Sequence, residues 1–249
     1  MNQNHTKAPV ALITGAARRI GAAIASLLHE KGFRVIVHYN QSAIEANELV
    51  DGFNKTSSNS AIALYANLMD KSDIEQLIHQ SIDWAGQLDC LVNNASVFIK
   101  TNPGFLNESD WDTLFTTNVQ APYWLSVTAK PYLDLTKGSI INLGDIHALK
   151  PLADYSLYCQ SKAALLMQTQ SLAKAFAPNI RVNTVSPGAI AWPEKDNALS
   201  ENIKATIIES TPLKKHGKPE YIAQAVLALI ENPFITGVNL PVDGGRSIS

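Results

Sequence analysis

Apolar residues along this chain occur either in short continuous runs or in longer segments where they recur at a helical spacing. The short runs predict strands, because strands buried on both faces of a parallel sheet show no polar alternation; they lie at 10–13, 34–37, 61–66, 88–92, 139–143, 181–185 and 238–241. The longer segments predict amphipathic helices at 22–31, 43–53, 72–84, 111–135, 155–176 and 221–231. Pro122 and Pro131 are expected to bend or interrupt the helix over 111–135.

This regular alternation of strand and helix is typical of an α/β protein with a parallel sheet. We expect a single-domain Rossmann fold, in which helices cover both faces of a doubly wound, seven-stranded parallel sheet with strand order 3-2-1-4-5-6-7. No repeat, low-complexity segment or shift in composition divides the chain. Residues 1–249 are therefore interpreted as one domain, with residues 1–8 as a flexible N-terminus.

The composition and charge narrow the possible partners. Of 249 residues, 46% are apolar and 17% are charged, and the net charge of −2 comes with no basic run, so neither nucleic acid nor an anionic membrane is expected. The polar N-terminus lacks the apolar core of a signal peptide, and no apolar run approaches the ~20 residues of a membrane span, so we expect a cytoplasmic protein. Cys90 and Cys159 lie in apolar segments, and neither a disulfide nor a metal site is predicted.

Tyr158 and Lys162 are the first candidates for chemistry. At positions i and i+4 of a predicted helix they lie on one face, which brings an ammonium beside a phenol. A nearby cation lowers the pKa of a phenol from ~10 towards working pH, where a general acid is most effective. Asp145, just after the predicted strand 139–143, joins this group. A surface Tyr/Lys pair with the same spacing is the alternative.

A glycine turn follows the first predicted strand. Gly15 permits the tight turn and Gly21 the close approach of the next helix, whose first N–H groups suit a phosphate. The second strand ends without the Asp or Glu that binds the ribose 2′-hydroxyl in NAD enzymes. Donors suited to a 2′-phosphate are present instead, which predicts NADPH; they are Arg18, His38, Asn40 and Ser42. The alternative is a merely solvated strand end.

Later strand ends carry further polar and aromatic side chains. Asn67 and Leu68 are expected to border an adenine, and the exit of strand 88–92 combines amides and small residues with Phe98, which suits a cofactor and a flat ligand. The segment 189–210 is interpreted as a substrate lid. All these features leave parallel strands at their carboxyl ends, where open α/β sheets bind ligands.

These residues together resemble the short-chain dehydrogenase/reductase family over nearly the whole chain. The matching motifs are Thr14-Gly15, Asn93-Asn94-Ala95, Asn118, Tyr158-x-x-x-Lys162 and Pro187-Gly188. Three departures from the common pattern are similar to pteridine reductases: Arg19 replaces the middle glycine of T-G-x-x-x-G-x-G, Asp145 replaces a serine, and His38-Tyr39 opens the ribose loop. Ser96 and Phe98 also match, whereas Asn67 stands where that family usually has an aspartate.

The resemblance implies an NADPH-dependent pteridine reductase, acting on a pterin of the biopterin, monapterin or folate type and assembled as a homotetramer. It implies catalytic roles for Asp145, Tyr158, Lys162 and Asn118, and substrate contacts from Arg19, Ser96, Phe98, Asp145 and Tyr158. The implied cofactor-binding residues are Gly15, Arg18, Arg19, Ile20, Gly21, His38, Tyr39, Asn40, Ser42, Asn67, Leu68, Asn94, Ala95, Ser96, Lys162, Pro187, Gly188 and Ile190.

In the expected reaction, a hydride reaches an electron-poor carbon and Tyr158 protonates the neighbouring heteroatom. Lys162 is expected to lower the pKa of Tyr158 and to bind the nicotinamide ribose, and Asn118 to hold a water linking the lysine to solvent. Asp145 passes on a proton if it is protonated, or orients Tyr158 if it is ionised. Alternatively, Asp145 only caps a turn and Phe98 only fills the core.

Two other functions stay open. One is a short-chain carbonyl reductase for a 3-oxoacyl thioester or a sugar, in which Asp145 is an unusual substitute for serine. The other is a dinucleotide-sensing regulator without turnover, although a sensor has no need for an acid such as Tyr158.

Overall fold

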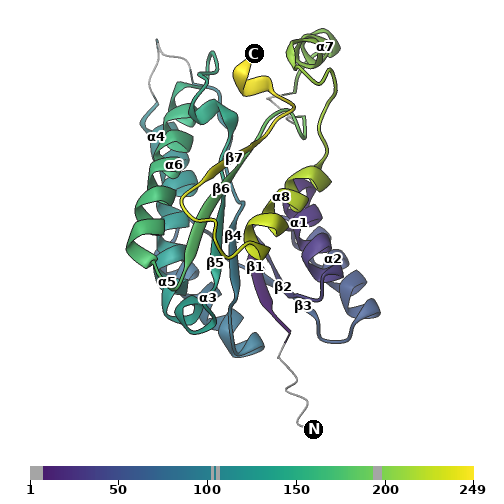
Figure 1. The fold of residues 1–249 in the computed structure, drawn as a ribbon, viewed down its shortest axis with the longest axis vertical. Coiled ribbons are helices and arrows are strands. Elements are labelled where there is room, and N and C mark those ends of the chain that lie inside the picture. The colour runs from purple at the N-terminus through teal and green to yellow at the C-terminus, as the bar shows by residue number, and fades with distance from the viewer. Residues whose placement is uncertain (1–7, 102–103, 105–106, 193–197) are drawn as a thin grey trace.

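A single parallel sheet of seven strands forms the centre of the molecule (Figure 1). The structure is a computed structural model, and it describes residues 8–101, 104, 107–192 and 198–249. The strands are β1 (Val10–Ile13), β2 (Arg34–Tyr39), β3 (Ala61–Tyr65), β4 (Cys90–Asn93), β5 (Ser139–Leu143), β6 (Arg181–Pro187) and β7 (Asn239–Val242). Their order is β3-β2-β1-β4-β5-β6-β7, so the predicted fold class and strand order are confirmed.

Helices cover the sheet in two layers, one on each side in Figure 1. One layer contains α1 (Arg19–Glu30), α2 (Ala43–Thr56) and α8 (Pro219–Glu231), and the other contains α3 (Lys71–Ala85), α5 (Ala121–Thr136) and α6 (Ser156–Phe176). No helix among the described residues is long and apolar enough to span a membrane.

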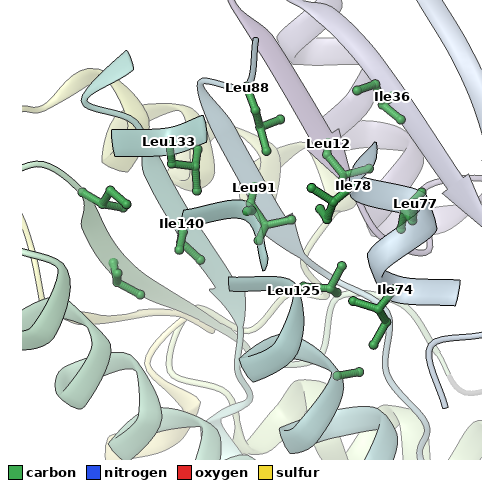
Figure 2. Close-up of a cluster of buried hydrophobic side chains, with 14 of the residues drawn as sticks. Leu12, Ile36, Ile74, Leu77, Ile78, Leu88, Leu91, Leu125, Leu133 and Ile140 are labelled. Atoms are coloured by element: carbon green, nitrogen blue, oxygen red, sulfur yellow. The ribbon is translucent and has the colours of Figure 1, made fainter. Parts of the chain in front are cut away.

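Both faces of the central strands are buried, which explains why their sequences are mostly apolar. Leu12 and Ile36 point towards the α3 and α5 side, where they pack with Leu91, Ile78 and Leu125 (Figure 2). The alternate residues of the same strands belong to a second cluster against α1 and α8. The two clusters together fix which side chains of each strand face each layer of helices.

The segment 111–135 is helical as predicted, but it is not one regular α-helix. The chain forms α4 (Glu108–Phe115), a π-helical turn η1 (Thr116–Gln120) and then α5. Pro122 lies in the first turn of α5, directly after the π turn, and the helix continues through Pro131. The break therefore lies at the π turn.

The segment expected to form a substrate lid contains a helix that periodicity did not predict, α7 (Glu201–Ser210). No α7 residue is fully buried, so its pattern lacks the apolar stripe of a core helix. Residues 193–197 of this segment, like most of the expected flexible N-terminus, lie outside the described part of the chain. In Figure 1, α7 and the C-terminal residues lie at the end of the sheet where the strands terminate. A lid function for residues 189–210 stays a prediction.

Candidate active site

The glycine turn lies between β1 and α1 and is braced by the residues after β4. Gly15 has a left-handed backbone with φ +60°, which glycine adopts without strain. The Asn94 amide donates to the carbonyls of Thr14 (2.8 Å) and Gly15 (3.0 Å). The Thr14 hydroxyl accepts from the N–H groups of Asn94 (2.9 Å) and Ala95 (3.0 Å). Asn94 and Thr14 thus hold the turn, and Thr14 was missing from the predicted cofactor-binding residues.

Gly21 allows the start of α1 to approach this turn. A Cβ at this position would lie 2.8 Å from Ala16 Cα and 2.7 Å from Asn94 Nδ2. We expect Gly21→Ala to lower the free energy of unfolding by about 1–3 kcal/mol, as overpacking does, and to weaken cofactor binding. Gly52→Ala is the matched control, because a Cβ at Gly52 in α2 meets nothing within 4 Å. In urea denaturation, Gly52→Ala should be more stable than the unaltered protein by about 0.5–1 kcal/mol. Equal stability of Gly21→Ala and the unaltered protein would contradict the close packing at Gly21.

His38 is buried, and the prediction that its side chain donates to a 2′-phosphate is wrong. Its exposed fraction is 1%. Nδ1 lies 3.0 Å from the Gly15 nitrogen, and Nε2 lies 3.0 Å from the Ala66 carbonyl oxygen. Both ring nitrogens therefore have partners inside the protein.

The remaining donors at the end of β2 are accessible. Arg18 and Asn40 are exposed, Tyr39 is half-buried with its ring edge on Tyr65, and Ser42 at the start of α2 makes no capping hydrogen bond with its side chain. Arg18 forms a loose ion pair with Glu45, with Nη1 and Oε1 3.8 Å apart. Glu45 was not among the residues predicted for this part of the site.

The residues expected at the adenine are tied into the local structure. The Asn67 side-chain oxygen accepts from the Met69 N–H at 3.2 Å, and the Asn67 N–H donates to Asp73 at 2.8 Å. The Leu68 side chain belongs to the hydrophobic core, so only its backbone is placed to face a ligand. Asn67 keeps one acceptor lone pair for an adenine amino group.

Arg19 joins the glycine turn to the loop after β6. Its backbone φ is +55°, unusual for a residue with a side chain, and its Nη2 donates to the carbonyls of Ala191 (3.1 Å) and Trp192 (2.9 Å). Ile20, next to it, is half-buried against the core. The predicted contacts of Arg19 with ligands compete with these two hydrogen bonds.

The end of β6 is packed closely against the segment after β7. A Cβ on Gly188 would lie 2.6 Å from Asp243 Cβ, which explains the glycine. Pro187 is buried, and the Ile190 side chain is part of the hydrophobic core. The predicted cofactor contact of Ile190 is therefore restricted to its backbone.

Tyr158 and Asp145 form the centre of the site. The Tyr158 hydroxyl donates to Asp145 Oδ2 at 2.7 Å, and Asp145 Oδ1 accepts from the His147 N–H at 2.8 Å. The second contact caps the short helix η2 (Ile146–Ala148). Asp145 thus has both functions that the sequence left as alternatives, since one oxygen caps a turn and the other binds the phenol.

The expected effect of Lys162 on Tyr158 is wrong in this structure. Burial and the negative charge of Asp145 raise the pKa of Tyr158 well above 10. The Lys162 ammonium donates instead to the Leu143 carbonyl at 2.9 Å and lies 5.8 Å from the Tyr158 ring centroid. Because its pKa is high, Tyr158 holds its proton at neutral pH, as a proton donor must.

Burial lowers the pKa of Lys162 to about 8, and the charge of Asp145 partly opposes this shift. A lysine is a cation below its pKa, so Lys162 loses its charge as the pH rises through about 8. If Lys162 holds the cofactor ribose, kcat/KM for the cofactor should fall by about tenfold per pH unit above that value. Lys162→Arg should move the fall to higher pH, because arginine stays charged. A kcat/KM for the cofactor that stays constant between pH 7 and 10 would contradict ribose binding by Lys162.

Asn118, in the π turn η1, fastens the loop after β4 to α6. Its Oδ1 accepts from the Val97 N–H (2.9 Å) and the Ser96 hydroxyl (3.1 Å). Its Nδ2 donates to the Val97 carbonyl (3.0 Å) and to Ser161 Oγ (3.1 Å). These contacts use all hydrogen bonds that an amide side chain can make. The predicted water relay therefore cannot use the Asn118 side chain.

An aromatic group lines the site beside Tyr158. The Phe98 ring stacks on Tyr155 with centroids 4.2 Å apart and an interplanar angle of 11°, and its contact with Tyr158 is edge-on at 4.7 Å. Ser96, two residues earlier, is exposed. Phe98 thus contributes to a local cluster and also borders Tyr158. Tyr155, which was not among the predicted site residues, belongs to the same wall.

A cation from the C-terminal segment lies near Asp145 and was also missed. The short helix η4 (Arg246–Ile248) packs against η2, and Lys150 Nζ donates to the Arg246 carbonyl at 2.9 Å. Burial lowers the pKa of Arg246, and the charges of Asp145 and Asp243 oppose the shift. No local sequence signal connects Arg246 with Asp145, since about a hundred residues separate them.

Comparison with known proteins identifies the family. A family model described as enoyl-(acyl carrier protein) reductase matches residues 15–247. The chain is 32% identical over 244 residues to the 3-oxoacyl-[acyl-carrier-protein] reductase of Synechocystis, covering 96% of each chain. It is 33% identical over 239 residues to the corresponding reductase of Staphylococcus epidermidis, covering 94% of this chain and 97% of that one. Glucose 1-dehydrogenase 2 of Bacillus subtilis is 28% identical over 96% of this chain and 94% of its own length.

These names agree better with the carbonyl reductase alternative than with the resemblance to pteridine reductases. The matches span almost the full length of both partners, and together with the parallel sheet and the Tyr158/Lys162 helix they leave no doubt about the class of enzyme. The chain is an oxidoreductase and belongs to the short-chain dehydrogenase/reductase family.

Proposed function

We propose that the chain is an NADPH-dependent pteridine reductase, with Tyr158 as the proton donor. The observation that carries this proposal is the 2.7 Å hydrogen bond from Tyr158 to Asp145 beside the Phe98 ring. An acidic group and an aromatic ring at the proton donor suit a flat heterocycle that carries amino and ring N–H groups. An acyl thioester offers few groups that such a surface could bind.

Members of this family use nicotinamide dinucleotides, and the residues at the sheet edge fit one. The glycine turn leaves no space for a Cβ at Gly21 and opens onto the first N–H groups of α1, as a pyrophosphate requires. Gly15, Arg18, Ser42, Asn67 and Lys162 would hold it. When bound, the nicotinamide ring supplies a hydride.

The chain's own residues supply the proton and the orientation. Tyr158 Oη holds a proton and gives it to the substrate heteroatom on which negative charge develops. Asp145 fixes the direction of the phenol while the capped η2 turn fixes Asp145. Lys162, a buried cation below its pKa of about 8 and one helical turn from Tyr158, would bind the cofactor ribose.

The second candidate function is reduction of a 3-oxoacyl thioester, and the relatives favour it. Two of the proteins described above are named 3-oxoacyl-[acyl-carrier-protein] reductases. In that case the substrate carbonyl oxygen would take the proton of Tyr158. The same Tyr158, Lys162 and cofactor residues serve both reactions, so the substrate alone separates them.

A substrate panel tests the proposal directly. Dihydrobiopterin, dihydromonapterin, dihydrofolate, acetoacetyl thioesters and simple ketones should each be assayed for NADPH consumption. We expect kcat/KM for at least one pterin to exceed that for every carbonyl compound. A preference for the acyl thioester would replace the proposal by the second candidate, and absence of turnover with every compound would favour the regulator.

Cofactor choice is a separate prediction. Arg18 should favour NADPH over NADH by about tenfold, since its side chain is half exposed and Glu45 competes with a phosphate for it. Arg18→Ala should remove most of this preference, and Glu45→Gln should increase it a few-fold. The measurement is kcat/KM for both cofactors. Equal values in the unaltered enzyme would refute the assignment of Arg18.

The homotetramer implied by the resemblance is part of the proposal. The contacts between chains would be formed by α4, α5 and α6, and large apolar side chains are exposed on these helices. They are Trp111, Tyr123, Val127 and Met167. Sedimentation should give about four times the chain mass of 27.0 kDa. A species of one chain mass would refute the assembly.

A further inference from the structure

His38 occupies an unusual position among the cofactor residues. It lies in β2, which runs between β1 and β3, and its ring is almost completely enclosed. One ring nitrogen is 3.0 Å from the Gly15 nitrogen in the glycine turn after β1. The other is 3.0 Å from the Ala66 carbonyl oxygen, directly after β3. The imidazole therefore spans the two segments on either side of its own strand.

The partners determine the tautomer of His38. A backbone N–H only donates, so Nδ1 must accept from Gly15; a carbonyl only accepts, so Nε2 must carry the hydrogen bound to Ala66. One neutral tautomer satisfies both contacts. Burial lowers the pKa of His38 to about 4, so this neutral form is present at working pH.

Backbone hydrogen bonds strengthen the same connection. The Ala16 N–H donates to the His38 carbonyl at 3.0 Å, and the Ala66 N–H donates to the Tyr39 carbonyl at 3.1 Å. The His38 side chain adds a contact that reaches from Gly15 to Ala66 through a single residue. Without it, the orientation of the Gly15 peptide would depend on glycine, which restrains its backbone least.

We propose that His38 is a positioning residue for the cofactor: its imidazole bridges the glycine turn and the end of β3, holding the pyrophosphate and adenosine sides of the binding site in register. This inference rests on the dinucleotide part of the proposed function and is independent of the pterin. It replaces the idea that His38 binds the 2′-phosphate itself. Asn40, Ser42 and Arg18 are left for that contact.

Loss of the bridge leaves a buried polar group of the turn without a partner. In His38→Gln the amide lies near the former Nε2 position, so the Gly15 N–H loses its acceptor. In His38→Asn the amide lies near the former Nδ1 position, so its oxygen can still accept from Gly15. We expect His38→Gln to weaken NADP⁺ binding by about tenfold and His38→Asn to weaken it less. Turnover at saturating cofactor should change little, because His38 is remote from Tyr158.

Isothermal titration with two ligands distinguishes a positioning role of His38 from a direct contact between His38 and the 2′-phosphate. Adenosine 2′,5′-bisphosphate carries the 2′-phosphate but lacks the pyrophosphate. If His38 positions the turn, His38→Gln should weaken NADP⁺ by about tenfold and adenosine 2′,5′-bisphosphate by less than about threefold. Equal weakening of both ligands would show a direct phosphate contact, and no change in either would show that the bridge is unnecessary. Both results would overturn the proposal. His79→Gln, at an exposed histidine of α3, is the control.

A measurement on the unaltered protein avoids the risk that variants misfold. Nitrogen-15 NMR of the histidine rings should show His38 as the neutral tautomer with its hydrogen on Nε2, without titration between pH 5.5 and 8. A hydrogen on Nδ1, or a pKa near the ordinary ~6.5, would overturn the bridge. Failure of the pterin assay would leave these binding and NMR results unaffected, so the two proposals fail separately.

Discussion

Replacing Tyr158 by phenylalanine should lower kcat by about 10²–10⁴, the usual contribution of a positioned general acid. The change removes only the hydroxyl that donates to Asp145, and the ring contact with Phe98 can remain. Cofactor affinity should therefore be almost unaffected. Single-turnover measurement of NADPH oxidation with bound substrate would isolate the chemical step from product release.

The control for this loss is Tyr221→Phe, which removes a hydroxyl from a partly exposed tyrosine of α8. It should retain full activity. Full activity in Tyr158→Phe would mean that the proton comes from Asp145 or from water. The aromatic wall would then serve only to hold the substrate.

Replacing Asp145 by serine should lower kcat/KM for a pterin by about 30–100-fold, the cost of losing a charge-assisted hydrogen bond in a buried site. Serine can still cap η2, so the substitution removes the negative charge and keeps the cap of the turn. The charge of Asp145 also raises the pKa of Tyr158. Its removal should make the phenol a stronger acid, and reduction of a simple ketone should change little or become faster.

Phe98→Ala is the companion variant. Stacking is present in both ground and transition states, so KM for a pterin should rise about tenfold or less while kcat stays closer to unchanged. Pterin and ketone should each be measured with both variants. Equal proportional losses for the two substrates, or faster pterin reduction by Asp145→Ser, would end the pteridine reductase assignment in favour of a carbonyl reductase.

The fold was predictable because its strands are buried on both faces. Runs such as 10–13 and 139–143 match β1 and β5 residue for residue, since strands inside a parallel sheet are mostly apolar. The buried Asn142 of β5 is an exception, and its side chain has hydrogen-bond partners in Asn93 and Thr169. The segment 111–135 was harder. A π turn retains helical periodicity on both sides, and the two prolines expected to bend or interrupt the helix, Pro122 and Pro131, both lie after it.

The site was predictable in its residue types but less so in its contacts. The spacing of Tyr158 and Lys162 placed both on one face, yet it could not show that the ammonium binds the Leu143 carbonyl. His38 was correctly placed at the end of β2, but its ring contacts Gly15 and Ala66, which follow β1 and β3. Partners brought together by strand order leave no local sequence signal.

The four hydrogen bonds of Asn118 have a consequence for engineering this enzyme. They join the loop that bears Ser96 and Phe98 to the helix that bears Tyr158, so these parts should behave as one rigid unit. The segment after β6 has exposed hydrogen bonds to the glycine turn, which Arg19 donates to Ala191 and Trp192. Libraries that vary the β6 loop should therefore redirect substrate preference while leaving the acid intact, whereas changes near Val97 should damage turnover whatever the substrate.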